Sequence, residues 1–196
     1  MDNIIHPFPC PIYQNVIEEH LWPEIQTKVF QYIRNNKDLF EPSWYLCPTL
    51  STFHVKDEQV LNISLLNSQI YSHVEKYLEY WGDFEKQPTS LTLHNIWVNI
   101  AKKGSYQEEH HHNDFFLSGT IYFQVNPESG PFQFINPLSA QSVLFNSPEK
   151  FGYSYTIKPQ NSMIIIFPSW MPHRVLANSS NEDRISVSFN IKSNFK

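Results

Sequence analysis

The spacing of apolar residues in the first part of the chain predicts two amphipathic helices. Apolar residues recur every three or four positions over 16–35 and again over 67–81. We expect the first helix to be interrupted at Pro23, because proline removes a backbone donor and crowds the preceding turn. We expect Asn67 or Ser68 to cap the second helix, since short polar side chains accept hydrogen bonds from the first backbone N–H groups.

The pattern changes at residue 90, where short apolar or alternating runs are separated by glycine, proline, asparagine and serine. Such runs are typical of a sandwich or barrel rather than of alternating βαβ units. We therefore expect one domain, in which a helical part over 1–89, irregular at 41–55, covers a double-layered β core over 90–192. The strands are predicted at 91–101, 105–112, 117–125, 131–135, 141–145, 153–158, 162–167, 173–177 and 184–192.

Composition and charge restrict the partners of this domain. The 196 residues are 41% hydrophobic, which is enough for a packed core. The net charge of −5 offers no basic surface for nucleic acid. No apolar run has the length of a membrane-spanning helix, and the first residues do not resemble a secretion signal. We therefore expect no membrane partner. Because Cys10 and Cys47 are too few and too far apart for a disulfide framework, we also expect a reducing, cytoplasmic setting.

The segment SYQEEHHHNDFFLSG, residues 105–119, contains candidate metal ligands. Because successive side chains of a strand point to opposite faces, His110 and His112 would share one face, and Asp114 would join them if the strand continues. His111 would point away. Either His110 with His112, or His112 with Asp114, would form two-thirds of a facial metal site that a distant residue completes. The alternative is a polar bend that binds no metal.

Two later segments supply possible partners for these residues. In SMIIIFPSWMPH, residues 162–173, an apolar strand is followed by a turn between two prolines, which restricts the position of His173. In RISVSFNIK, residues 184–192, polar and apolar residues alternate strictly, so Arg184 and Ser186 lie on the polar face. This face either lies in water or lines a cavity in which Arg184 binds a carboxylate through two hydrogen bonds. The residues alone leave both interpretations open.

Several motifs follow one another in a fixed order along the chain. Together they resemble the Fe(II)/2-oxoglutarate-dependent oxygenases, in particular a branch found in bacteria and marine phages. The resemblance extends from residue 8 to residue 190 and implies a double-stranded β-helix, a jelly-roll or cupin-like core covered by helices. The motifs are FPCPIY at 8–13, WVN at 97–99, G-x-Y-x-x-x-H-x-H-x-x-x-x-L-S-G-x-x-Y at 104–122, FPSWMPH at 167–173 and RISVSFN at 184–190.

The resemblance implies an enzyme that binds Fe(II) and 2-oxoglutarate and uses dioxygen to hydroxylate a small-molecule or peptidyl substrate, with release of succinate and CO2. In this branch the metal ligands would be His110, His112 and His173, and His112 would replace the usual carboxylate. The plain superfamily rule would instead select His112, Asp114 and His173. We favour the first set, because the register of the branch motif is free of gaps.

The resemblance also implies a site for the cosubstrate. Arg184 would bind the distal carboxylate of 2-oxoglutarate, assisted by Ser186 and Tyr122. Two other classes of protein compete with this interpretation. A cupin-type metalloprotein that does not use 2-oxoglutarate would leave Arg184 and Ser186 without a function. A non-catalytic binding protein on the same fold would not need all the candidate ligands. We expect Phe115 and Phe116 to lie at the entrance of the site, and the substrate is not defined by these motifs.

Overall fold

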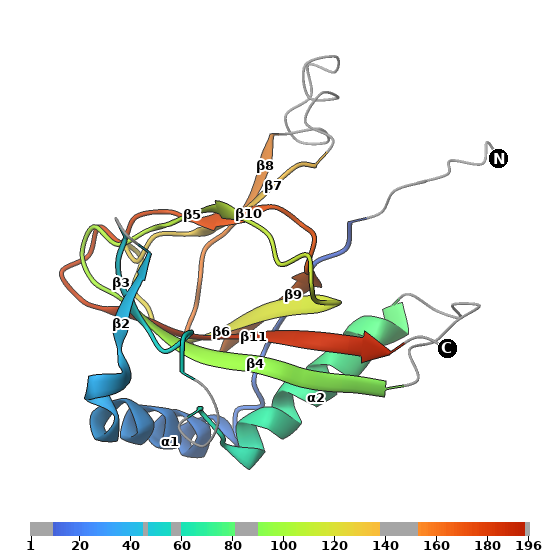
Figure 1. Ribbon diagram of the computed structural model, residues 1–196, viewed down its shortest axis with the longest axis horizontal. Coiled ribbons are helices and arrows are strands. Elements are labelled where there is room, and N and C mark those ends of the chain that lie inside the picture. Colours follow the sequence, from blue (N-terminus) through green and yellow to red (C-terminus); the bar gives the residue numbers. More distant parts are fainter. Residues whose placement is uncertain (1–9, 45–46, 56–59, 81–89, 138–152, 195–196) are drawn as a thin grey trace.

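The computed structural model describes residues 10–44, 47–55, 60–80, 90–137 and 153–194, and it divides them into two antiparallel sheets and a helical layer (Figure 1). The helices are α1 (Trp22–Asn35), the short 3-10 helix η1 (Lys37–Leu39) and α2 (Ser64–Tyr80). The strands are β1 (Tyr13–Val16), β2 (Glu41–Trp44), β3 (Cys47–Ser51), β4 (Ser90–Ala101), β5 (Gln107–His110), β6 (Leu117–Gln124), β7 (Phe132–Ile135), β8 (Ser154–Ile157), β9 (Met163–Pro168), β10 (His173–Val175) and β11 (Arg184–Asn194).

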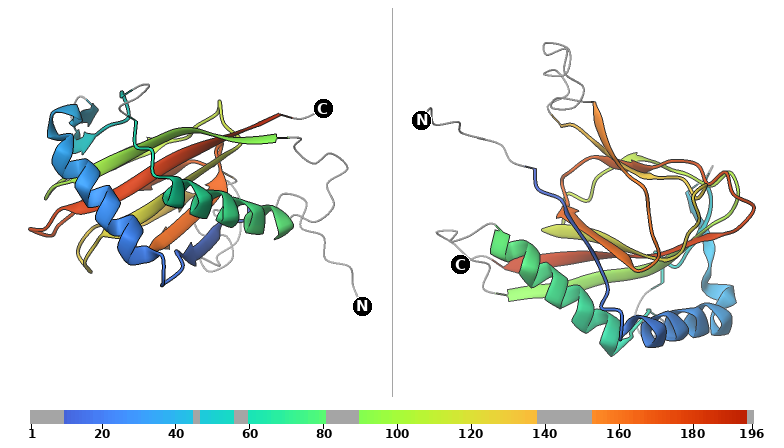
Figure 2. Two further views of the ribbon diagram at one scale, coloured as in Figure 1. Left: turned by 90° about the horizontal axis from the view of Figure 1, so that it is seen from below. Right: turned by 180° about the vertical axis from the view of Figure 1, so that it is seen from behind.

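The two sheets form the double-layered core. The larger sheet has the strand order β1-β9-β6-β11-β4-β3-β2, and the smaller sheet has the order β5-β10-β7-β8. The smaller sheet faces one side of the larger sheet, and α1 and α2 cover the other side (Figures 1 and 2). The prediction of a mainly β jelly-roll fold with N-terminal helices is therefore confirmed.

Both helices begin at different residues than the sequence pattern predicts. Pro23 does not interrupt α1 but lies in its first turn, where the missing N–H has no partner within the helix in any case. The second helix begins at Ser64, so Asn67 and Ser68 lie inside it and do not cap it. Among the described residues no helix is long and apolar enough to cross a membrane.

The part of the chain before residue 90 is less helical than expected, because three strands join the larger sheet. Strand β1 pairs with β9 at one edge, and the β2–β3 hairpin pairs with β4 at the other edge. The prediction of irregular structure over 41–55 is wrong for 41–44 and 47–51, which are strands, and holds for 52–55. These strands have four or five residues, and β2 and β3 each contain a proline, so no period of two is visible in them. The strand predicted at 141–145 lies outside the described residues.

Strand β11 separates two hydrophobic clusters. Its apolar side chains pack with the helices in one cluster, which includes Val187 and Phe189. The second cluster lies between the sheets and includes Tyr122, Phe132 and Phe167. Because β11 is a central strand, paired with β6 on one side and β4 on the other, its polar face also points into the protein rather than into water.

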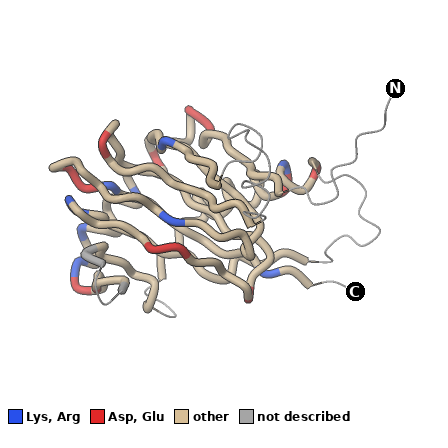
Figure 3. The backbone as a smooth tube through the Cα atoms, turned by 90° about the horizontal axis from the view of Figure 1, so that it is seen from above, with Lys and Arg blue, Asp and Glu red and all other residues tan. Residues whose placement is uncertain are grey.

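Lysines and arginines do not gather along one element in the described part of the chain. Figure 3 shows them spread among the acidic residues. The ion pairs include Lys28 with Glu24, which lie one turn apart on α1. This distribution agrees with the net charge of −5.

Candidate metal centre and cosubstrate pocket

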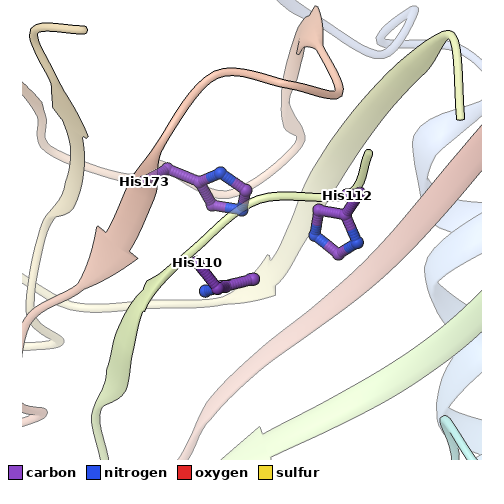
Figure 4. Close-up of side chains that lie close together, drawn as sticks. All are labelled: His110, His112 and His173. Atoms are coloured by element: carbon purple, nitrogen blue, oxygen red, sulfur yellow. The ribbon is translucent and has the colours of Figure 1, made fainter. Parts of the chain in front are cut away.

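Three histidines from distant parts of the sequence meet between the sheets. His110 ends β5 and His173 begins β10, and the two are direct partners in the antiparallel pairing of these strands. His112 lies beyond the end of β5, where its backbone N–H donates to the carbonyl of Ser169 at 2.7 Å. Figure 4 shows the three rings grouped together, and one ligand atom from each lies within 4.8 Å of the others.

Backbone carbonyls determine which ring nitrogen of two of these histidines carries hydrogen. The Nδ1 atom of His110 lies 2.7 Å from the carbonyl oxygen of Glu108, and that of His173 lies 2.9 Å from the carbonyl oxygen of Met171. Because a carbonyl only accepts, each Nδ1 must donate, and in the neutral ring the Nε2 atom then carries the lone pair. Such hydrogen bonds orient metal-binding histidines in other proteins.

Burial keeps the three imidazoles neutral at physiological pH. It is the main cause that lowers the pKa of His110, His112 and His173, and nearby histidines contribute further. The pKa of His112 falls to about 4, and that of His173 lies well below its usual value. Neutral imidazole is the form that binds a divalent metal, so this donor set fits iron.

Aromatic side chains from both sheets hold His173, Phe132 on β7 of the smaller sheet and Phe167 on β9 of the larger sheet. The Phe132 ring stacks on the imidazole with a centroid distance of 5.3 Å and an interplanar angle of 11°. The Phe167 ring meets it edge-on at 4.7 Å. These contacts restrict the rotation of the imidazole and exclude water from its surroundings, which preserves its neutral form.

Asp114 is not part of this group. Strand β5 ends at His110, and the chain turns at 113–114, so the alternation that would place Asp114 beside the histidines does not extend that far. Asp114 and His111 are both exposed, and the cluster of candidate ligand atoms contains neither. Among the described residues, the structure therefore brings together the His110, His112 and His173 set.

The cosubstrate residues expected from the sequence line the same cavity as the histidines. This cavity has a volume of about 390 Å³, and Arg184, Ser186 and Tyr122 contribute to its walls. Arg184 is only 5% exposed. The interpretation of β11 as an outer strand with its polar face in water is thus wrong, and the alternative, a strand lining a cavity, describes its position.

Three backbone carbonyls that the sequence did not reveal hold the Arg184 guanidinium. Its Nη1 donates to the carbonyl of Ser129 at 2.8 Å, to that of Gly130 at 3.2 Å and to that of Leu176 at 3.4 Å. Gly130 has a φ of +75°, and a Cβ there would collide with the backbone carbonyl of Leu176. The glycine before Pro131 in the sequence was the available signal, since a left-handed residue at a tight approach favours glycine. Burial also raises the pKa of the Tyr122 phenol, while the charge of Arg184 opposes this.

The aromatic residues at the cavity differ from those expected. Phe115 and Phe116 do not line it, because the turn after His112 directs them elsewhere: Phe116 packs against the core beneath the larger sheet. Phe53 and Trp97 lie in the wall instead. Phe53 follows β3, a strand that the sequence pattern did not predict, so its position was not accessible from the sequence.

The fold and the site define a jelly-roll protein in which a three-histidine cluster and a buried arginine share one cavity. Residues 95–190, which include the three histidines and Arg184, match a family of proteins described as "Putative 2OG-Fe(II) oxygenase". This part of the chain belongs to that family. The protein is accordingly an oxidoreductase that uses Fe(II) and 2-oxoglutarate.

Solved structures share the fold at low sequence identity. They include a prolyl-4-hydroxylase from Pseudomonas putida, with a TM-score of 0.61, 12% identity, and coverage of 92% of this chain and 91% of that one. HygX from Streptomyces hygroscopicus, with nickel, 2-oxoglutarate and hygromycin B bound, has a TM-score of 0.59, 10% identity, and coverage of 93% and 82%. A prolyl hydroxylase from Trichoplax adhaerens in complex with a hypoxia inducible factor peptide has a TM-score of 0.57 and 14% identity, and the match covers 91% of this chain and 83% of that one. No curated protein matches the chain.

Proposed function

We propose that the protein hydroxylates an organic substrate, with conversion of 2-oxoglutarate and dioxygen to succinate and CO2. His110, His112 and His173 would bind Fe(II), and Arg184 would bind the distal carboxylate of 2-oxoglutarate. The observation that carries this proposal is that the three imidazoles and the guanidinium line one cavity. When bound there, ferrous iron would supply the activation of dioxygen that organic side chains cannot provide.

Three neutral ligands suit an anionic cosubstrate. Because no carboxylate of the described residues belongs to the histidine cluster, both positive charges of the ferrous ion would remain to attract 2-oxoglutarate. The Arg184 guanidinium can form two parallel hydrogen bonds to a carboxylate, which specifies orientation as well as charge. The Ser186 hydroxyl and the Tyr122 phenol line the cavity beside it and would add hydrogen bonds to the same carboxylate.

The protein would also restrict access of water to the reaction. Phe132 and Phe167 cover His173, and both are at least 96% buried. A dry wall on this side favours oxidation of the bound substrate over side reactions with water. Overall, a substrate C–H bond, 2-oxoglutarate and dioxygen are converted to a C–OH bond, succinate and CO2.

The first test is binding without turnover. Fe(II) and 2-oxoglutarate are added anaerobically to the wild type and to His110→Ala and His111→Ala. We expect a weak visible charge-transfer band in the wild type and in His111→Ala, because the exposed His111 lies outside the cluster. The band should be absent from His110→Ala, which lacks one ligand. An equal band in both variants would contradict the ligand assignment.

The second test is turnover. With dioxygen present, succinate should form in the wild type, and mass spectrometry of the products should detect the gain of one oxygen atom. Hydroxylation would be excluded if the folded protein shows the anaerobic band and releases succinate when a compound is added, but none of these compounds gains an oxygen atom.

A further inference from the structure

The cavity continues past the cosubstrate residues along the larger sheet. In the register of this sheet, Asn99 lies opposite Ser186 on one side and opposite Ser51 on the other, and Trp97 lies opposite Ser188. Directly opposite residues in antiparallel strands share a face, so these side chains line the cavity together. We call the region lined by Ser51, Phe53, Trp97, Asn99 and Ser188 the β3–β4 subsite.

An aromatic wall connects this subsite to the histidines. The centroid of the Trp97 ring lies 6.2 Å from that of His112 and 5.0 Å from that of Phe53, which it meets edge-to-face at 73°. Trp97 is 9% exposed and Phe53 is 55% exposed. The wall therefore runs from the candidate metal centre to the protein surface. Apolar C–H groups packed on it would lie beside the centre.

A primary amide is fixed at the floor of the subsite. Asn99 Oδ1 accepts a hydrogen bond from the Ser51 hydroxyl at 2.9 Å, and Asn99 Nδ2 donates to the Ser188 hydroxyl at 3.1 Å. These two bonds determine the orientation of the amide. A primary amide has two N–H donors and two acceptor lone pairs, so these contacts use half of its capacity. The half-buried Asn99 can therefore donate to and accept from a ligand in the cavity.

The subsite has no charged side chain of its own. Among the described residues that line the cavity, none is aspartate, glutamate or lysine, and the permanent charge of Arg184 lies at the cosubstrate end. The three histidines belong to the candidate metal centre and not to this subsite. A charged group in the β3–β4 subsite would lose its hydration without gaining an opposite charge, which disfavours binding strongly.

We propose that the β3–β4 subsite selects an uncharged part of the substrate: a C–H-rich ring or chain that packs on Trp97 and Phe53 and carries an amide-like group that hydrogen-bonds to Asn99. Hydroxylation of that group rests on the function proposed above, but its binding does not. Substrates whose reacting part bears a carboxylate or an ammonium group would be rejected, because nothing in the subsite compensates their charge.

The test compares three ligands of one shape and different charge: benzamide, benzoate and benzylamine. Binding to the full-length protein is measured by saturation-transfer NMR with Zn(II) as a diamagnetic metal and with excess 2-oxoglutarate, which keeps benzoate away from Arg184. We expect benzamide to bind at least about tenfold more tightly than either charged ligand. Trp97→Ala and Asn99→Ala should each weaken benzamide binding. The control Thr92→Ala, at an exposed position of the same strand, should leave benzamide binding unchanged.

Each result decides the proposal. The proposal is overturned if benzoate or benzylamine binds as tightly as benzamide or more tightly and Trp97→Ala weakens that binding. It is also overturned if Trp97→Ala does not weaken the binding of benzamide, or if benzamide does not bind. Because Trp97 is largely buried, its loss can also unfold the protein. Asn99→Ala removes the amide and its bonds to Ser51 and Ser188 but leaves the aromatic wall in place, so it reports independently of Trp97. The signals of 2-oxoglutarate, compared between wild type and Arg184→Ala, separately test the cosubstrate site. If 2-oxoglutarate does not bind but benzamide does, the proposed function fails and the subsite remains.

Discussion

Replacement of Arg184 separates binding of the cosubstrate from binding of the metal. In Arg184→Ala, the carbonyls of Ser129 and Gly130 lose a charged donor, and the cavity loses its carboxylate-binding group. A hydrogen bond to a charged group contributes about 1.5–3 kcal/mol, so we expect the affinity for 2-oxoglutarate to fall roughly 10- to 150-fold. Iron affinity should stay within about twofold, because Arg184 is outside the histidine cluster.

Calorimetric titration of the zinc-loaded protein with 2-oxoglutarate measures the first quantity, and anaerobic titration with Fe(II) measures the second. Arg184→Lys retains the charge but not the planar pair of donors, so it should also bind 2-oxoglutarate weakly while losing less stability. Arg34→Ala, on the exposed face of α1, is the matched control. Wild-type affinity for 2-oxoglutarate in folded Arg184→Ala, or loss of iron together with 2-oxoglutarate, would refute the assignment.

Three predictions concern stability. Gly119→Ala should lower the free energy of unfolding by about 1–3 kcal/mol in urea, because the new Cβ meets the buried Phe189 ring; an unchanged midpoint would contradict this. Ser118→Ala removes the hydrogen bonds between its hydroxyl and the side chains of Asn190 and Ser169 and should cost about 1–3 kcal/mol by the same measurement. Burial is the main cause that lowers the pKa of His73 in the folded protein, so the unfolded state binds its proton more readily. The contribution of His73 to stability should therefore be fully present above about pH 6.5 and be lost as the pH falls from there through the folded pKa. His110, His112 and His173 contribute in the same direction, so His73→Gln should weaken the pH dependence of stability without abolishing it, and an unweakened dependence would exclude the contribution of His73.

The strictly alternating and strongly periodic segments were predictable from the sequence. The RISVSFNIK segment places Val187 in the core and Arg184 in the cavity, as its period of two requires. The sequence could not decide whether its polar face met water or a cavity, because that depends on β4 and β6 pairing on both sides. The short strands β2 and β3 escaped prediction because they depend on pairing, β2 with β3 and β3 with β4, and not on their own pattern.

Local pattern alone could not decide whether His110 or Asp114 joins His112 and His173, for a similar reason. Alternation extends only as far as a strand continues, and β5 ends at His110 because the chain then turns at 113–114. His112 therefore reaches the cluster from outside the strand. A backbone hydrogen bond to Ser169, which lies 57 positions later in the sequence, holds it there. No local sequence pattern predicts such a contact.

The candidate metal centre depends on both sheets. His110 and His173 belong to the smaller sheet, where a shift of the β5–β10 register by one residue would turn one of them out of the cavity. His112 is held by the Ser169 carbonyl, and the Ser169 hydroxyl bonds that of Ser118 on β6, a strand of the larger sheet. The three ligands therefore meet only when the two sheets have closed on each other. A metal that binds all three must stabilise that closed state over the unfolded chain, so binding of iron and closure of the jelly roll are thermodynamically coupled.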